Sequence, residues 1–184
     1  MMTIFENRNE LLNIFDKNIN ICEIGVFKGE FSKLLYEIIK PNELHLIDIF
    51  EGKMCSGDKD GNNIVWTNLN DEYNFLLNYF SPFKNIFIHK GKSSTLLKSF
   101  NDDFFDLIYI DGDHSYTGVK EDLTMSYDKI KHNGYICGHD YTNEKFPGVF
   151  KAVNEFCEEK KLSINYLTKD GCPTFCIKNE KNLG

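Results

Sequence analysis

Hydrophobic positions recur along this chain at two different spacings. Apolar runs with the length of buried strands occupy the segments 19–26, 43–50, 85–90, 104–110, 134–139, 163–167 and 174–178. Apolar residues three and four positions apart, the spacing of a helix face, occupy the segments 31–39, 69–80, 119–130 and 149–157. The pattern also predicts a helix near the N-terminus, over residues 6–17. Strands and helices are therefore expected to alternate along most of the chain.

Strands that alternate with helices favour a parallel sheet, because each helix returns the chain to the same end of the sheet. We therefore expect an α/β fold with a doubly wound, Rossmann-like sheet of seven strands and helices on both faces. Only the short segment TKDGCP separates the last two strands, which predicts an antiparallel C-terminal hairpin. Residues 1–184 are expected to form one domain, with a helix within 1–18 and a substrate loop or lid at 51–68.

The charge and the cysteines narrow the class of protein. A net charge of −7 argues against a general binder of nucleic acid or of anionic membranes. No apolar run approaches the length of a membrane span, and the first residues lack the order of a secretory signal. Six scattered cysteines without a CxxC pair are typical of reduced thiols in an intracellular protein. We expect a cytoplasmic location.

In open parallel sheets, ligands bind beyond the carboxyl ends of the strands, so the residues that follow each strand are candidates. Glu23, Gly25 and Gly29 follow the first strand in the turn EIGVFKGEF, although an ordinary strand–helix turn explains the glycines nearly as well. Asp48 ends the second strand, where a carboxylate accepts hydrogen bonds from a ribose or simply caps a loop. Ser93 follows the third strand, either near a bound base or as a helix N-cap. The turn and Asp48 together favour nucleoside binding.

Acidic and histidine side chains follow the fourth and fifth strands. The fourth strand leads to Asp111, Asp113 and His114, and the fifth leads to His139 and Asp140. If the two strands are neighbours, repulsion between the acids is costly unless they share a cation or a proton. Carboxylates suit Mg²⁺, Ca²⁺ or Mn²⁺, and imidazole shifts the choice toward Mn²⁺, Fe or Zn²⁺. Helix capping is an adequate alternative for Asp113 alone but does not account for the whole cluster.

Several segments, in their order along the chain, resemble class I S-adenosylmethionine-dependent methyltransferases. They are EIGVFKGEF, LHLIDIFEG, YIDGDHSYTGVKEDL, GYICGHDY and FPGVFKAVNEFC, and the likeness covers roughly residues 19–178. The glycine turn is generic to that superfamily. The segments YIDGDHSYTGVKEDL and GYICGHDY are more specific, and they are most similar to sugar O-methyltransferases, a group that includes the macrocin O-methyltransferase-like enzymes.

The resemblance implies that S-adenosylmethionine is the cofactor. It implies that Glu23, Gly25 and Gly29 surround the methionine part of the cofactor. Asp48 would accept hydrogen bonds from both ribose hydroxyls, and Ser93 would lie near the adenine.

The resemblance also implies a divalent cation, Mg²⁺ or Mn²⁺, held by acids that follow the fourth and fifth strands. These are Asp111, which would also border the cofactor, and Asp140. His139 stands where such relatives often carry another acid, and it joins the expected metal ligands. Asp113 matches the position of the general base in related sugar methyltransferases, with His114 as the alternative base.

The resulting hypothesis is an O-methyltransferase that acts, with metal assistance, on a hydroxyl of a small polyhydroxylated acceptor, a sugar or glycan. Methyl transfer from a sulfonium is an in-line displacement, so the protein chiefly aligns the reactants and removes a proton. One alternative is a metal-independent methyltransferase with His114 or His139 as base. Others are a nicotinamide-dependent oxidoreductase, which the missing GxGxxG disfavours, and a non-catalytic nucleoside-binding module. The acceptor's identity and a homodimeric state stay open.

Overall fold

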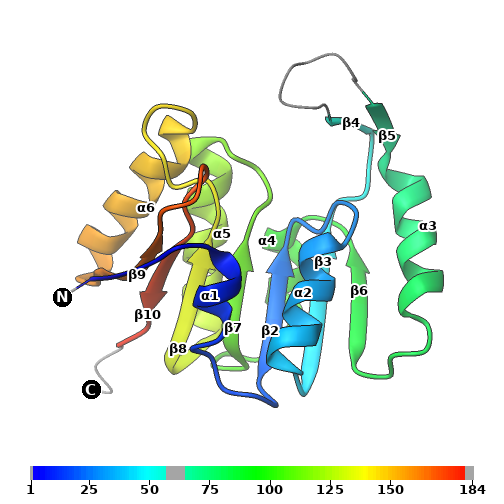
Figure 1. Cartoon of the computed structure of the whole chain (residues 1–184), viewed down its shortest axis with the longest axis horizontal. Coiled ribbons are helices and arrows are strands. Elements are labelled where there is room, and N and C mark those ends of the chain that lie inside the picture. Colours follow the sequence, from blue (N-terminus) through cyan, green and yellow to red (C-terminus); the bar gives the residue numbers. More distant parts are fainter. Residues whose placement is uncertain (1, 57–64, 181–184) are drawn as a thin grey trace.

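The chain forms a central β-sheet with helices on both faces (Figure 1). The computed structural model describes residues 2–56 and 65–180. In their order across the eight-stranded sheet, the strands are β1 (Thr3–Phe5), β9 (Ile164–Thr168), β10 (Phe175–Lys178), β8 (Ile130–Gly138), β7 (Phe105–Ile110), β2 (Asn20–Ile24), β3 (Glu43–Asp48) and β6 (Ile86–Lys90). A separate antiparallel pair joins β4 (Lys53–Ser56) to β5 (Val65–Asn68).

The helices divide between the two faces and bury one apolar core on each. The first core contains side chains of α1 (Arg8–Leu12), α2 (Glu30–Ile39) and α3 (Leu69–Phe80). The second contains side chains of the 3₁₀ turn η1 (Leu97–Ser99), which continues α4 (Ser93–Leu96), and of α5 (Tyr116–Lys129) and α6 (Pro147–Lys160). No helix in the described part of the chain is both long and apolar enough to span a membrane.

The predicted α/β class, with its mostly parallel sheet and antiparallel C-terminal hairpin, is confirmed. The sheet has eight strands instead of seven, because β1 pairs in parallel with β9 at one edge. Strand β10 lies between β8 and β9 and runs antiparallel to both.

Two predicted segments differ in detail from the structure. The expected helix over 6–17 is only Arg8–Leu12, because β1 precedes it and Asn7 caps it by accepting a hydrogen bond from the Glu10 N–H. The segment 51–68 is not wholly irregular, since β4 and β5 pair within it. Residues 57–64, the centre of the expected lid, lie outside the described residues.

The order of the strands determines where a ligand can bind. From β2 the chain proceeds through β3 to β6 on one side, whereas β7 and β8 lie on the other side. In such sheets a crevice opens at the carboxyl ends of the strands where the order reverses, here β2 and β7. Gly25 and Asp111 follow these two strands directly, and the Asp111 N–H donates to the Ile24 carbonyl at 2.7 Å. The glycine turn and the acidic cluster are thus held next to each other.

Candidate active site

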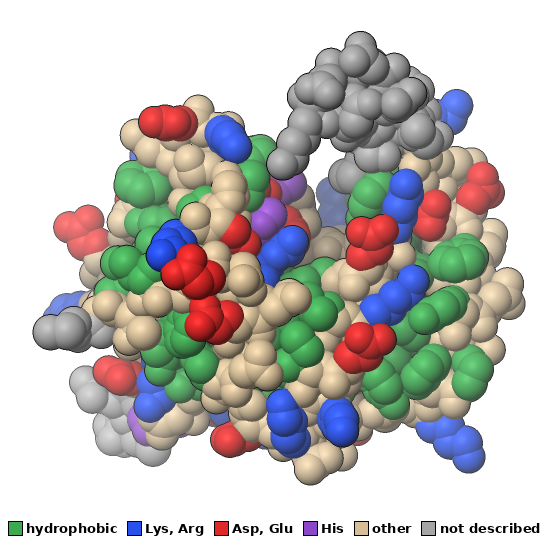
Figure 2. Space-filling view, viewed as in Figure 1, with side chains coloured by type: hydrophobic (Ala, Val, Ile, Leu, Met, Phe, Trp, Pro, Cys, Tyr) green, Lys and Arg blue, Asp and Glu red, His purple; other side chains and the backbone are tan. Residues whose placement is uncertain are grey.

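A cavity of about 430 Å³ lies at the carboxyl ends of the central strands. Its volume falls within the usual range for sites of small molecules and cofactors. Four of the six residues predicted to bind the cofactor line it, namely Gly25, Asp48, Ser93 and Asp111. Figure 2 shows acidic and histidine side chains beside the hollow at this end of the molecule. The cavity is therefore the candidate cofactor site.

The carboxylate of Asp48 is fixed by the glycine turn. Its Oδ2 accepts hydrogen bonds from the N–H groups of Val26 (2.8 Å) and Phe27 (3.0 Å), and its Oδ1 accepts one from Phe50 (2.8 Å). A carboxylate has about four acceptor positions, so these bonds leave capacity for a ligand. Asp48 thus connects β3 to the turn after β2, and its predicted contact with a ribose stays a prediction.

The other two predicted cofactor residues do not border this cavity. Glu23 is buried in β2, and its Oε2 accepts a hydrogen bond from the Ser32 hydroxyl at 2.5 Å. Gly29 precedes α2 with φ +70°, and a Cβ there would come within 2.6 Å of a Leu76 side-chain carbon. Both residues build and pack the turn, whereas Gly25, Asp48 and their neighbours face the cavity.

The pKa of Glu23 is raised to about 8, chiefly because burial penalises the charged carboxylate. In the unfolded chain its pKa returns to 4.5, so the folded protein binds a proton that the unfolded chain releases between these values. This contribution to stability is complete below pH 4.5 and is lost as the pH rises through about 8.

We therefore expect Glu23→Gln to flatten the pH dependence of stability. Urea unfolding of both proteins between about pH 6 and about pH 8 measures it, because the wild-type free energy of unfolding falls over this range. The difference between wild type and variant isolates Glu23 from other titrating groups. Parallel curves for the two proteins would contradict the assignment.

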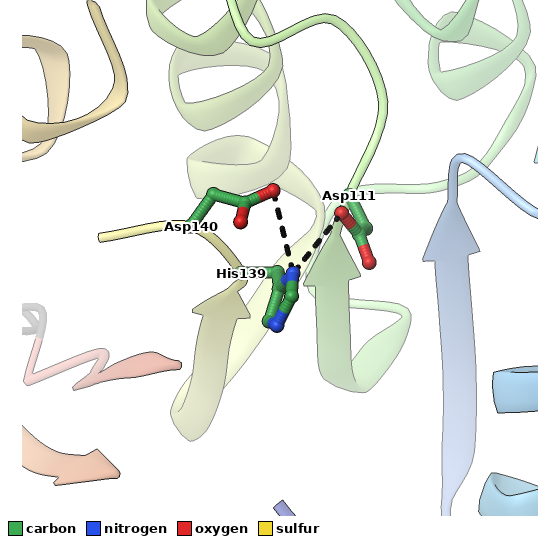
Figure 3. A group of neighbouring side chains, drawn as sticks. All are labelled: Asp111, His139 and Asp140. Atoms are coloured by element: carbon green, nitrogen blue, oxygen red, sulfur yellow. Dashed lines mark ion pairs between the residues drawn. The ribbon is translucent and has the colours of Figure 1, made fainter. Parts of the chain in front are cut away.

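The structure brings Asp111, His139 and Asp140 together, and Figure 3 shows their side chains pointing toward one another. His139 Nδ1 lies 3.3 Å from Asp140 Oδ2 and 3.7 Å from Asp111 Oδ1. One ligand atom from each residue lies within 4.8 Å of the others. The register of β7 beside β8, with Ile110 opposite Gly138, accounts for this convergence.

His114 joins the same cluster from the loop before α5. Its Nε2 lies 2.8 Å from Asp140 Oδ2 and 3.5 Å from Asp111 Oδ1. His114 therefore contacts both carboxylates of the cluster. Its ring also packs against Phe146, with centroids 5.0 Å apart.

Burial, hydrogen bonding and charge together shift the pKa values of the whole cluster. Asp111 and Asp140 raise the pKa of His114 to about 10. Burial lowers the pKa of His139, but the two carboxylates outweigh it and bring the pKa to about 9. Burial raises the pKa of Asp111 and of Asp140, yet the two histidines outweigh this and hold both below the usual value. At neutral pH the cluster therefore consists of two imidazolium groups and two carboxylates.

Asp113 stands apart from this cluster. Its side chain is exposed, Oδ1 accepts the Ser115 N–H at 2.8 Å, and Oδ2 accepts the Ser115 hydroxyl at 2.9 Å. Ser115 in turn caps α5 by accepting from the Gly118 N–H at 3.1 Å. Asp113 supports the start of the helix and also lines the cavity, so its geometry is compatible with both interpretations from the sequence.

Sequence reasoning missed Arg8, which α1 places over the acidic end of the site. Its Nη1 lies 3.9 Å from Asp111 Oδ2, and its guanidinium stacks on the Phe31 ring at 4.9 Å from the centroid. Arg8 is the sole arginine of the chain, and this is the feature of the sequence that could have marked it as a candidate site residue. An arginine suits a half-buried position beside a carboxylate and an aromatic ring better than a lysine does.

Comparisons with known proteins are consistent with a cofactor site at this cavity. A family described as "Methyltransferase domain" matches residues 22–141, more than half of the chain. An uncharacterized protein of Acanthamoeba polyphaga mimivirus is 29% identical over 157 residues, which cover 83% of this chain and 64% of that protein. The chain thus spans less than two thirds of this curated relative.

Two solved structures share the fold. The trans-methyltransferase CalH, in complex with SAH, matches with a TM-score of 0.64 at 10% identity, over 93% of this chain and 55% of CalH. The N-methyltransferase NodS from Bradyrhizobium japonicum also matches with a TM-score of 0.64, at 15% identity and over 95% of each chain. Because the family match covers the glycine turn, β7 and the whole acidic cluster, the chain belongs to the methyltransferase-domain family.

Proposed function

We propose that this chain is an S-adenosylmethionine-dependent O-methyltransferase whose acceptor is a small polyhydroxylated molecule, a sugar or glycan. The observation that carries the proposal is the position of Asp111, which borders both the cavity and the acid–histidine cluster. A methyl donor in the cavity would meet an acceptor hydroxyl beside groups that handle protons. The sugar-like acceptor rests on the resemblance of YIDGDHSYTGVKEDL and GYICGHDY to sugar O-methyltransferases.

The cavity suits an adenosyl ligand. Gly25 offers backbone without a side chain, Asp48 offers carboxylate oxygens for ribose hydroxyls, and Ile47 and Ile49 offer apolar surface for a base. The similar fold of CalH, which was solved with SAH, is compatible with this placement. Asp48 and Gly25 lie on adjoining strand ends, so the ribose and the methionine part would occupy neighbouring positions.

The donor set of Asp111, His139 and Asp140 fits a divalent cation, because two carboxylates and an imidazole offer their ligand atoms within 4.8 Å of one another. His139 has to lose its proton before its nitrogen can bind a metal. A bound cation would lower the pKa of the acceptor hydroxyl.

Side chains of the protein would remove the proton from the acceptor hydroxyl and orient the groups around it. We assign proton removal to Asp113, which borders the cavity and whose orientation Ser115 fixes. His114 is the alternative base. The two neighbouring carboxylates favour its protonated form, so it would first have to release a proton. Asp140 is buried and orients both histidines.

A metal-independent version of the same reaction is the second candidate. Arg8, His114 and His139 already supply positive charge next to Asp111 and Asp140, so the cluster is compensated without a cation.

Isothermal titration with S-adenosylhomocysteine and acceptor screening with radiolabelled S-adenosylmethionine test the proposal. We expect cofactor binding and methyl transfer to sugar nucleotides or glycans, with activity lost after chelation and restored by Mg²⁺ or Mn²⁺. Absence of cofactor binding would refute the proposal. Full activity after chelation would favour the metal-independent version.

A further inference from the structure

Asp122 is a buried carboxylate with no role in the proposed methyl transfer. It lies on α5, its residue is only 4% exposed, and it lines the cavity. Burial raises its pKa to about 6. A buried acid of this kind is costly unless hydrogen-bond donors surround it. The hydrogen-bond donors around Asp122 therefore indicate whether the protein alone satisfies its carboxylate.

One of its oxygens has a partner within the protein, and the other faces the ligand space. Oδ1 accepts a hydrogen bond from the Ser93 hydroxyl at 2.5 Å. Among the described residues no group donates to Oδ2. This oxygen lies beside Gly112, where an added Cβ would come within 3.8 Å of it. Gly112 also lines the cavity, so Oδ2 is an acceptor at the cavity wall.

The other residues that line the cavity indicate what kind of ligand group could donate a hydrogen bond to Asp122 Oδ2. Ile24, Ile47 and Ile49 line the same cavity with apolar surface, and Gly112 leaves room for a flat group. Asp48 is attached to the glycine turn, whereas Asp122 is attached to Ser93 at the start of α4. A ribose at Asp48 therefore leaves Asp122 for a different part of the nucleoside, a planar ring with an N–H donor on its edge.

We propose that Asp122 recognises the base of the cofactor, with Oδ2 accepting a hydrogen bond from the exocyclic amine of adenine. The chain would thereby select a 6-amino purine over a 6-oxo purine, which carries a carbonyl acceptor in place of the amine at position 6 and has its N–H donor at N1 instead. This inference rests on the proposed use of an adenosyl cofactor. Ser93 acts as a positioning residue, since its hydroxyl fixes the carboxylate.

Titration with S-adenosylhomocysteine and with S-inosylhomocysteine, which carries an oxo group in place of the amine, tests the assignment. Wild type is expected to bind the adenosyl ligand more tightly than the inosyl ligand, by a factor of about ten or more. Asp122→Asn keeps the size of the side chain and, with its oxygen toward Ser93, turns an N–H toward the ligand. The preference should then fall to about threefold or less, or reverse.

Asp128→Asn is the matched control, because Asp128 is exposed on the same helix and does not line the cavity. It should retain the wild-type ratio of affinities. Equal weakening of both ligands in Asp122→Asn, or an unchanged ratio, would overturn the inference while leaving cofactor binding established. A wild type that binds neither ligand would refute the proposed function and this inference together.

A measurement on wild type alone covers the case in which the variant does not fold. The charges of Glu121 and Asp113 act on Asp122, and the charge of Asp122 acts on the Cys22 thiol. The Ser93 hydroxyl donates a hydrogen bond to Asp122, and Lys92 lines the same cavity. Below a pKa of about 6 the carboxyl holds a proton and becomes a donor. The preference for the adenosyl ligand should therefore shrink by up to about tenfold for each pH unit below that value. A ratio that is the same at about pH 5 and about pH 8 would overturn the proposal.

Discussion

Replacing Gly25 with alanine is expected to destabilise the protein by roughly 3 to 5 kcal/mol and to abolish cofactor binding. Gly25 has φ +89°, and an added Cβ would lie 2.1 Å from the Asp111 carbonyl oxygen and 2.4 Å from the Asp111 carbonyl carbon. Both atoms belong to the backbone of the strand end that carries the acidic cluster, so no rotation of a side chain relieves the clash. The ends of β2 and β7 would have to separate at the site itself.

Gly52→Ala is the matched control for this change. Gly52 also has a positive φ, +82°, but an added Cβ would meet nothing within 4 Å. Its cost should be the backbone strain alone, about 1 to 2 kcal/mol. Urea unfolding and titration with S-adenosylhomocysteine measure both variants. If the two variants lose equal stability, the close approach of Gly25 to Asp111 is not what requires glycine.

The helices and strands that the sequence predicts well are those with a complete apolar face. In α2, for example, Leu35 and Ile39 are four positions apart and both fully buried. Strand β1 has no such signal, because it is three residues long and its Ile4 is 56% exposed. Its pairing with β9 depends on backbone contacts between distant parts of the chain, which no local pattern specifies.

The same limit applies to the position of β10. TKDGCP indicates a hairpin, but it does not specify that β10 lies between β8 and β9. That arrangement places Cys176 opposite both Cys137 and Tyr166, residues that are far from one another in the sequence. Pairing between distant strands is set by the packing of the whole sheet, which periodicity does not describe.

The residues of the candidate site also divide into those that the local sequence predicts and those that depend on contacts between distant parts of the chain. Asp111 and Asp140 were predictable neighbours because each follows a strand, and the carboxyl ends of parallel strands share an edge. Arg8 reaches Asp111 only because α1 folds over that edge, a contact that spans about a hundred residues of chain.

Asp122 is a different case, since the sequence did hold a signal. It lies three positions after Val119 and next to Leu123, on the face of α5 that is otherwise buried. An acid on an apolar helix face needs a partner. Its raised pKa follows from that burial.

Replacing Asp140 with asparagine is expected to lower kcat by about 10²- to 10⁴-fold, the range for loss of a group that supports proton transfer. Asp140 is buried and faces both histidines, so removing its charge leaves two imidazolium groups with Asp111 as their remaining close carboxylate partner. Asparagine is the appropriate replacement because Asp140 has φ +62°, a conformation that asparagine tolerates and alanine does not.

Cofactor affinity should change by less than about threefold, because Asp140 is not among the described residues that line the cavity. Glu144→Gln is the control, since it removes one charge from an exposed position of the adjoining loop. Initial rates with radiolabelled S-adenosylmethionine give kcat, and titration with S-adenosylhomocysteine gives the affinity. A parallel loss of rate and affinity would make Asp140 a structural residue, and an unchanged kcat would remove the cluster from the reaction. Loss of rate with affinity intact would show that the cluster acts on the acceptor side, because only the transfer step then depends on its charge.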